Sequence, residues 1–335
     1  MQVSAVLRAW KKILSGEKPT LSIEITRECP LRCPGCYAYG SDHLGGDVTL
    51  RELSDYKGQE LVDNIMRAVD HYQPLHLSLV GGDPLVRYRE LEQLVPLITK
   101  RGIHLQIVTS AFRPFPLEWS KTPLLNVVVS IDGLQPEHDV RRTPATYERI
   151  LKNIADQKVT VHCTITGQMM KRDGYLEEFV RFWNARPEIR RIWFSIFTPQ
   201  MGESMPEILT RQERAQVVTS LLALRKIYPK LDMAPEMIQQ FANPPASPKD
   251  CIFAQTTATI SADLATFITP CQFGGKPDCT QCGCAASMGL EAVGAYKLGG
   301  LLPVKSLFDL SIGIGRKMSR GSTPVVAENP FQVLR

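Results

Sequence analysis

Residues 21–36 read LSIEITRECPLRCPGC. The first six of these residues are rich in β-branched and apolar side chains and predict a β-strand. Cys29, Cys33 and Cys36 follow at once in a C-x3-C-x2-C spacing. Three thiolates on one short loop can converge on one face of a metal centre. This stretch therefore predicts a strand that leads directly into a metal-binding loop.

The three cysteines alone leave the kind of metal open. A zinc site needs four ligands, and His43 is the local candidate for the fourth. A 4Fe–4S cluster held by three cysteines instead leaves one iron open to a ligand from outside the protein. An open iron at the end of a barrel strand is a catalytic arrangement rather than a structural one.

Strands and helices alternate after this loop and predict parallel βαβ units. Six such units are too few for a closed eight-fold barrel, and nearly continuous apolar strands predict a sheet covered on both faces. The predicted fold class is therefore α/β, a partial (β/α)6 barrel with its chemistry at the carboxyl ends of the strands. Predicted strands cover residues 21–26, 76–80, 105–109, 126–131, 159–165 and 191–197, and two helices begin at the capping boxes Thr49/Glu52 and Thr210/Glu213.

Three regions are expected along the chain. An amphipathic helix occupies residues 1–17, the partial barrel residues 18–230, and a small cysteine-rich domain with a tail residues 231–335. A Pro-rich stretch at 243–249 marks the change in composition. Two short strands, 256–260 and 266–269, are predicted in the last region.

A second group of cysteines lies in this last region. It contains Cys251, Cys271, Cys279, Cys282 and Cys284. A structural zinc site and a second iron–sulfur cluster both need four thiolates, so counting ligands does not separate them. The remaining cysteine, Cys163, lies in a predicted apolar strand and is expected to be a small buried hydrophobe.

Composition excludes several classes of protein. The 335 residues are 44% hydrophobic and 22% charged, which is ordinary for a globular protein and excludes wholesale disorder. A net charge of +5 predicts no nucleic-acid partner. The sequence has no apolar run of about 18 residues and no ordered signal peptide, so the expected location is the cytoplasm, where thiols stay reduced.

Gly81-Gly82-Asp83-Pro84 follows the second predicted strand. Together with the C-x3-C-x2-C loop after the first strand, and with Tyr37 after the last cysteine, it makes the sequence resemble the radical S-adenosylmethionine (radical SAM) superfamily, whose corresponding motif is Gly-Gly-Glu-Pro. The stretch from Cys251 to Pro270-Cys271 resembles the start of a SPASM or twitch auxiliary-cluster domain. Such a full domain carries seven or more cysteines, so five predict a single auxiliary 4Fe–4S cluster.

The resemblance implies an enzyme. Its cofactors are a 4Fe–4S cluster, a second auxiliary 4Fe–4S cluster and S-adenosylmethionine, which one electron cleaves to a 5′-deoxyadenosyl radical. That radical abstracts a hydrogen atom from a peptide, small-metabolite or lipid substrate. Two alternatives stay open: an activase that installs a glycyl radical on a partner enzyme, and a non-enzymatic iron–sulfur or zinc protein.

The resemblance also implies site residues. Cys29, Cys33 and Cys36 hold the first cluster, and the ligands of the second are expected to be Cys251, Cys271 and Cys282 with Cys279 or Cys284. The residues implied for S-adenosylmethionine are Tyr37, Gly81, Gly82, Asp83, Pro84, Ser130 and Asp132. Ser130 and Asp132 have an equal alternative, as a strand-end hydroxyl and a turn residue. Arg141 and Arg142 are candidates for a carboxylate clamp, although paired arginines more often lie on a solvated surface.

Partners follow from the same resemblance. A one-electron donor such as flavodoxin or ferredoxin is expected. Peripheral membrane contact is a further expectation, because the N-terminal helix and the stretch 288–318 are both amphipathic and basic. The alternative, which the sequence favours, is that both segments close the open side of the barrel.

Overall fold

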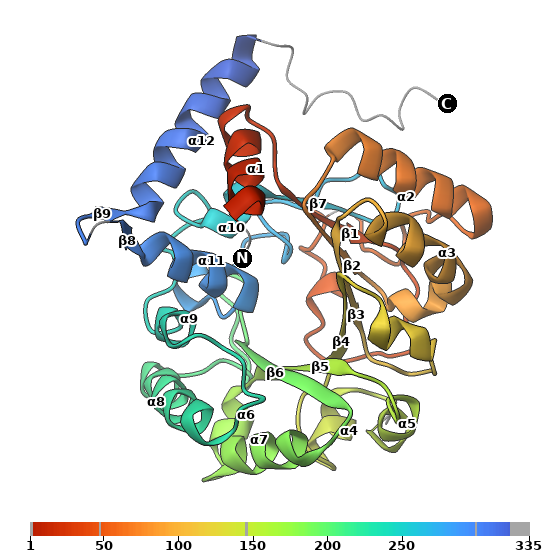
Figure 1. Cartoon of the computed structure of the whole chain (residues 1–335). Coiled ribbons are helices and arrows are strands. Elements are labelled where there is room, and N and C mark those ends of the chain that lie inside the picture. The colour runs from red at the N-terminus through yellow and green to blue at the C-terminus, as the bar shows by residue number, and fades with distance from the viewer. Residues whose placement is uncertain (1–2, 47, 145–146, 299, 322–335) are drawn as a thin grey trace.

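The computed structural model describes residues 3–46, 48–144, 147–298 and 300–321. Within these residues, seven parallel strands form one curved sheet in the order β6-β5-β4-β3-β2-β1-β7 (Figure 1). The sheet is open, so the predicted α/β partial-barrel class is confirmed. Its strands are β1 (Thr20–Glu24), β2 (His76–Val80), β3 (His104–Thr109), β4 (Leu125–Ser130), β5 (Val159–Ile165), β6 (Ile189–Ile196) and β7 (Thr257–Ile260).

Most helices of the barrel connect successive strands and cover the outer face of the sheet (Figure 1). Those of the barrel are α2 (Gly58–Tyr72), α3 (Tyr88–Thr99), α4 (Glu137–Arg141), α5 (Tyr147–Asn153), α6 (Gly167–Met170), α7 (Tyr175–Ala185) and α8 (Arg211–Ile227), with short 3-10 turns η1 (Tyr37–Tyr39), η2 (Pro84–Arg87) and η3 (Leu117–Lys121). The remaining elements are α1 (Val3–Leu14), α9 (Pro235–Gln240), α10 (Ile252–Thr256), η4 (Cys279–Gln281), α11 (Ala285–Ala295), α12 (Val304–Gly321) and the hairpin β8 (Lys297–Leu298) and β9 (Leu302–Pro303).

The two faces of the sheet differ in polarity. Successive side chains of a strand point to opposite faces. The outward set, such as Leu21 and Ile23, packs with the helices in one large apolar core. The inward set is polar: Thr160 donates to Asn126 at 2.8 Å, and His162 bonds Ser195 at 2.8 Å. The inner face of the sheet is therefore a polar wall, in contrast to the apolar outer face.

The seventh strand comes from beyond the Pro-rich stretch. β7 pairs in parallel with β1, with Thr20 opposite Thr257 and Ile23 opposite Ile260. The sequence predicts this strand but not its place beside β1. The strand predicted at 266–269 is reduced to a single bridge between Ile260 and Phe267. β7 therefore brings the C-terminal region to the first cysteine loop.

The two capping boxes have different outcomes. Thr210 and Glu213 cap α8 reciprocally, as predicted. Thr49 and Glu52 also bond each other, but α2 begins only at Gly58. The reason is tertiary, because the Asp55 carboxylate is held by the Thr26 hydroxyl and the Arg87 guanidinium, each within 2.7 Å.

The N-terminal helix packs on the C-terminal helix, α12 (Figure 1). Trp10 stacks near Phe308, with ring centroids 4.7 Å apart, and its indole N–H donates to Ser311. Leu7 and Leu310 stay exposed on the same pair of helices. In the described part of the chain, no helix is both long and apolar enough to cross a bilayer. Peripheral membrane contact stays a prediction.

Arg214 on α8 is one of the polar connections between the barrel and the cysteine-rich segment. Its buried guanidinium donates to the carbonyls of Phe241, Gln281 and Cys282 at 2.6–3.0 Å. Arg214→Ala leaves these carbonyls without their donor and should lower the free energy of unfolding by roughly 3 kcal/mol. Urea denaturation measures this, with the exposed Arg211→Ala on the same helix as the control. Equal losses in the two variants would contradict this role.

Candidate metal and cofactor site

The first cysteine loop starts four residues after β1 and lies at the carboxyl edge of the sheet. Burial raises the pKa of the Cys29 thiol to about 12, and the charges of Asp83, Cys36 and Cys33 add to the rise. Burial also raises the pKa values of Cys33 and Cys36, while the Arg142 guanidinium lowers them. The three sulfurs therefore lie close enough to influence one another, in surroundings that disfavour uncompensated thiolates.

The turn after β2 packs directly against the root of this loop. The Asp83 amide donates to the Glu28 carbonyl at 2.9 Å. A Cβ at Gly82, whose φ is +52°, would lie 2.2 Å from that same carbonyl oxygen, and one at Gly81 would lie 2.2 Å from Glu24 Cβ. Only glycine fits this approach. In this structure, the two glycines are needed for contact between the turn and β1.

The Asp83 carboxylate is fully engaged within the protein. Its oxygens accept hydrogen bonds from the Leu85 amide, the Thr109 hydroxyl, and both the amide and the hydroxyl of Ser110, at 2.5–3.0 Å. Pro84 follows as the first residue of η2. Asp83 therefore caps η2 and joins the ends of β2 and β3. Its predicted contact with S-adenosylmethionine stays a prediction.

Asp132 forms the centre of a buried ion-pair cluster after β4. Its carboxylate receives two bonds from Arg142, at 2.9 and 3.0 Å, and one from the Thr164 amide at 3.0 Å. Arg141 lies 3.4 Å away and also pairs with Glu207. The two arginines are thus mostly buried, not solvated. Ser130 lies two residues earlier and is buried at the end of β4.

Tyr37 lies between the two cysteine groups. Its ring is 39% exposed, but its hydroxyl is enclosed, so burial raises its pKa, followed by the charges of Glu24, Cys36, Cys284 and Cys271. The ring meets the Phe273 ring edge-on, with centroids 5.4 Å apart. Tyr37 is therefore placed beside both groups, one residue after Cys36 and across from the Cys271 loop.

All five C-terminal cysteines line one narrow cavity, whose other walls are mostly Pro, Phe and Ala side chains. Burial raises the pKa of Cys271 to about 12 and that of Cys279 to about 11, and neighbouring sulfurs add to both. Cys251 and Cys282 influence both of these thiols. The Cys284 sulfur accepts a hydrogen bond from the Gln272 amide at 3.1 Å. Five sulfurs around one apolar cavity are an appropriate donor set for an iron–sulfur cluster.

His43, the candidate zinc ligand, uses both ring nitrogens elsewhere. Nε2 lies 2.8 Å from a Glu24 carboxylate oxygen, and Nδ1 lies 2.9 Å from the Phe273 carbonyl oxygen. Among the residues that the structure describes, no group of three or more His, Cys, Asp or Glu side chains surrounds a single-ion position. Cluster ligands bond different irons and stand farther apart than ligands of one ion.

Cys163 lies fully buried in β5, where the sequence places it.

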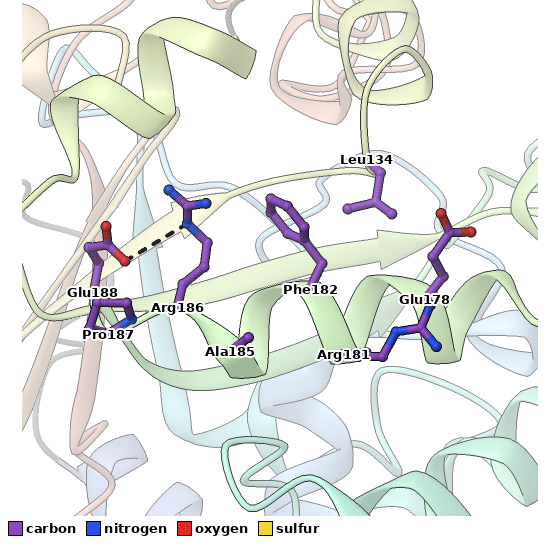
Figure 2. A pocket seen from close by; sticks show the side chains of 8 residues that line it. All are labelled: Leu134, Glu178, Arg181, Phe182, Ala185, Arg186, Pro187 and Glu188. Atoms are coloured by element: carbon purple, nitrogen blue, oxygen red, sulfur yellow. Dashed lines mark ion pairs between the residues drawn. The ribbon is translucent and has the colours of Figure 1, made fainter.

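A separate open groove runs along α7 and reaches the amino end of β6 (Figure 2). Its walls include Phe182 and the ion pair of Arg186 with Glu188, whose Nε and Oε2 are 3.8 Å apart. No cysteine lines this groove, which lies on the α7 side of the sheet.

The sequence did not predict the surroundings of three buried side chains beside the cysteine loops. Glu24 was not singled out among the residues of the predicted strand 21–26. Arg142 was a candidate for a carboxylate clamp or a surface residue, and His43 was considered only as a zinc ligand. The available signal for Glu24 was a charged residue in a strand whose other residues are mostly apolar, since a buried carboxylate needs a partner.

Comparison with known proteins connects the site to a family. The sequence profile of the Radical SAM superfamily matches residues 23–182. The S-adenosylmethionine-dependent nucleotide dehydratase of Psychrobacter lutiphocae is 30% identical over 105 residues, 30% of this chain and 35% of that protein. The Fe-coproporphyrin III synthase of Methanosarcina barkeri is 25% identical over 226 residues, 64% of this chain and 53% of that protein. The chain thus spans about half or less of the length of these relatives.

The fold is similar to that of Streptococcus suis SuiB, in its crystal structure bound to precursor peptide SuiA. The TM-score is 0.54 at 16% identity, and the match covers 81% of this chain and 63% of that one. At this identity the likeness concerns the fold alone. It extends beyond the residues that the superfamily profile matches.

Asp132 should make stability depend on pH in the acid range. Although burial opposes it, the charges of Arg142 and Arg141 lower the pKa of this carboxyl from 3.8 to about 2. Because its pKa is lower in the folded state, the ionised Asp132 stabilises the fold at pH values above the ordinary pKa of 3.8. This contribution is lost as the pH falls through about 2. The stability difference between the wild type and Asp132→Asn should therefore shrink by roughly 2 kcal/mol between pH 5 and pH 2.

Urea denaturation at several pH values measures this difference. The matched control is Asp63→Asn on the exposed face of α2. A difference that stays constant for Asp132→Asn would refute the ion-pair explanation.

Proposed function

We propose that this chain, whose residues 23–182 match the Radical SAM superfamily profile, is an enzyme that cleaves S-adenosylmethionine reductively and abstracts a hydrogen atom from its substrate. The observation that carries the proposal is the loop of Cys29, Cys33 and Cys36 at the carboxyl edge of the sheet, with the Gly81–Gly82 turn packed against its root. When bound, a 4Fe–4S cluster with an open iron and S-adenosylmethionine would supply one-electron cleavage to a 5′-deoxyadenosyl radical.

The protein's own residues would hold and enclose this chemistry. Cys29, Cys33 and Cys36 would bind the cluster, and Arg142 places positive charge beside Cys33 and Cys36. Asp132 fixes that arginine through two hydrogen bonds. Tyr37, Gly81, Gly82, Asp83, Pro84, Ser130 and Asp132 remain the proposed surroundings of S-adenosylmethionine. Asp83 would act there by fixing the turn, because its oxygens already accept four bonds.

We assign a second, auxiliary 4Fe–4S cluster to the C-terminal cysteines as part of the same proposal. Its support is the shared cavity, around which all five sulfurs gather. Cys251, Cys271 and Cys282 are the proposed ligands, with Cys279 or Cys284 as the fourth. The proposed region boundaries stay at residues 17 and 230, although β7 joins the barrel sheet from beyond the second boundary.

The substrate proposed is a peptide or another polar molecule. The polar inner wall of the sheet, with Asn126, His162 and Ser195, favours such a substrate over a lipid chain. SuiB, which shares the fold, binds a precursor peptide. A flavodoxin or ferredoxin would donate the electron, and a cytoplasmic location stays a prediction. The activase alternative is not carried forward, because the second cysteine group lies after β6 and around β7 rather than soon after the first cysteine loop.

Iron content tests the two-cluster proposal. Protein reconstituted without oxygen should bind about eight irons, and Cys271→Ala about four. Cys279→Ala and Cys284→Ala form a matched pair, of which only the variant that lacks a ligand should lose iron. About four irons together with one zinc in the wild type would refute the auxiliary cluster.

Product analysis tests the reaction. Replacing Cys29, Cys33 and Cys36 with Ala should abolish 5′-deoxyadenosine formation under dithionite, because no open iron is then held. Cys163→Ala is the control and should keep the activity, since Cys163 is buried in β5 outside both groups. Chromatography with mass detection measures the product. Unchanged 5′-deoxyadenosine formation in the triple variant would exclude the proposed reaction.

A further inference from the structure

His43 is one of the side chains that link the first cysteine region to the C-terminal one, and it uses both ring nitrogens to do so. Nε2 lies 2.8 Å from Glu24 at the end of β1, and Nδ1 lies 2.9 Å from the carbonyl oxygen of Phe273, two residues after Cys271. Glu24 and His43 are 1% and 2% exposed. The second Glu24 oxygen accepts from the hydroxyl of Ser261, which follows β7.

The partners determine where the protons are. A carbonyl oxygen can only accept a hydrogen bond, so Nδ1 must carry a proton and donate it to Phe273. Nε2 faces a carboxylate oxygen, so a second proton lies between His43 and Glu24. Nδ1 therefore bonds the Cys271 loop, and Nε2 bonds the buried Glu24 carboxylate.

The Cys271 loop is shaped to receive His43. Gly274 has a φ of +66°, and a Cβ there would lie 1.8 Å from the backbone oxygen of His43. Only glycine permits this approach. On the other side of the loop, the Gln200 side chain accepts a bond from the Lys276 amide at 2.7 Å. The loop that carries Cys271 and Phe273 is thus held between His43 and the segment after β6.

We propose that His43 is a positioning residue for the C-terminal cluster: its Nδ1 bond to the Phe273 carbonyl holds the Cys271 loop in the conformation that binds iron. The proposal rests on the auxiliary cluster of the proposed function. The bond from Nε2 has a different role, because it gives the buried Glu24 carboxylate a hydrogen-bond partner. Outer contacts that orient ligands typically change metal affinity about 10- to 100-fold when removed.

Two amide substitutions separate these bonds. The Asn amide nitrogen can occupy the place of Nδ1, so His43→Asn keeps a donor for Phe273 and leaves Glu24 without its histidine partner. The Gln amide nitrogen reaches the place of Nε2, so His43→Gln keeps a donor for Glu24 and loses the bond to Phe273. If His43 only stabilised the fold, the variant with the lower Tm would also be the variant that releases iron faster.

The experiment measures iron release to a chelator and thermal unfolding on the full chain. Release is repeated with Cys29, Cys33 and Cys36 replaced by Ala, so that only C-terminal irons are counted. His43→Gln should release these irons about 10-fold faster than the wild type with little loss of Tm. His43→Asn should show the reverse, a lower Tm with release near the wild-type rate. His104→Gln, exposed at the amino end of β3, is the control.

The outcomes are distinct. If His43→Asn is the worse variant in both measurements, or if neither variant changes the release rate, the proposal is overturned while the auxiliary cluster stands. If the wild type binds no C-terminal iron, the auxiliary cluster falls as well. Should His43→Asn fail to fold, His43→Asn with Glu24→Gln removes the unpaired buried charge, and release near the wild-type rate is still required.

Discussion

The pairing of β1 with strands on both sides is the constraint on which the site depends. β1 lies between β2 and β7, and all three run in parallel. Parallel strands end at one edge of the sheet, so the segments that follow them meet there. The cysteine loop follows β1, the Gly81–Asp83 turn follows β2, and the Cys271 loop follows β7. Without the pairing of β1 with β7, the two cysteine groups would have no common location.

Buried charge at this edge is arranged in pairs rather than left single. Asp132 is matched by Arg142, Glu24 by His43, and Asp55 by Arg87. A buried charge without a partner is costly, so each pair restricts the backbone that carries it. Two of these pairs lie beside the cysteine loops. The site therefore combines an apolar outer core, which provides stability, with a charged edge, which provides position.

Several elements could be predicted because their causes are local. The strands at 76–80 and 159–165 have the bounds that the pattern of side chains predicts, and α8 begins at its capping box. Thr49 and Glu52 have the same local pattern as that box, yet α2 starts later. Contacts of Asp55 with Thr26 and Arg87, distant in sequence, hold the intervening residues. A local sequence pattern cannot reveal contacts with distant residues that compete with helix formation.

The sequence by itself determined the chemical inventory: two groups of cysteines, a Gly-Gly-Asp-Pro turn, and strands alternating with helices. From these follow the resemblance to the radical SAM superfamily and the open α/β sheet. Only the tertiary structure decided how these parts meet. It paired β7 with β1, turned Asp83 toward Ser110, buried Arg142 beside the cysteines, and directed His43 to Glu24 and Phe273. The physical reason is that spacing along a chain sets which ligands are neighbours in sequence, whereas burial and long-range pairing set which charges must find partners.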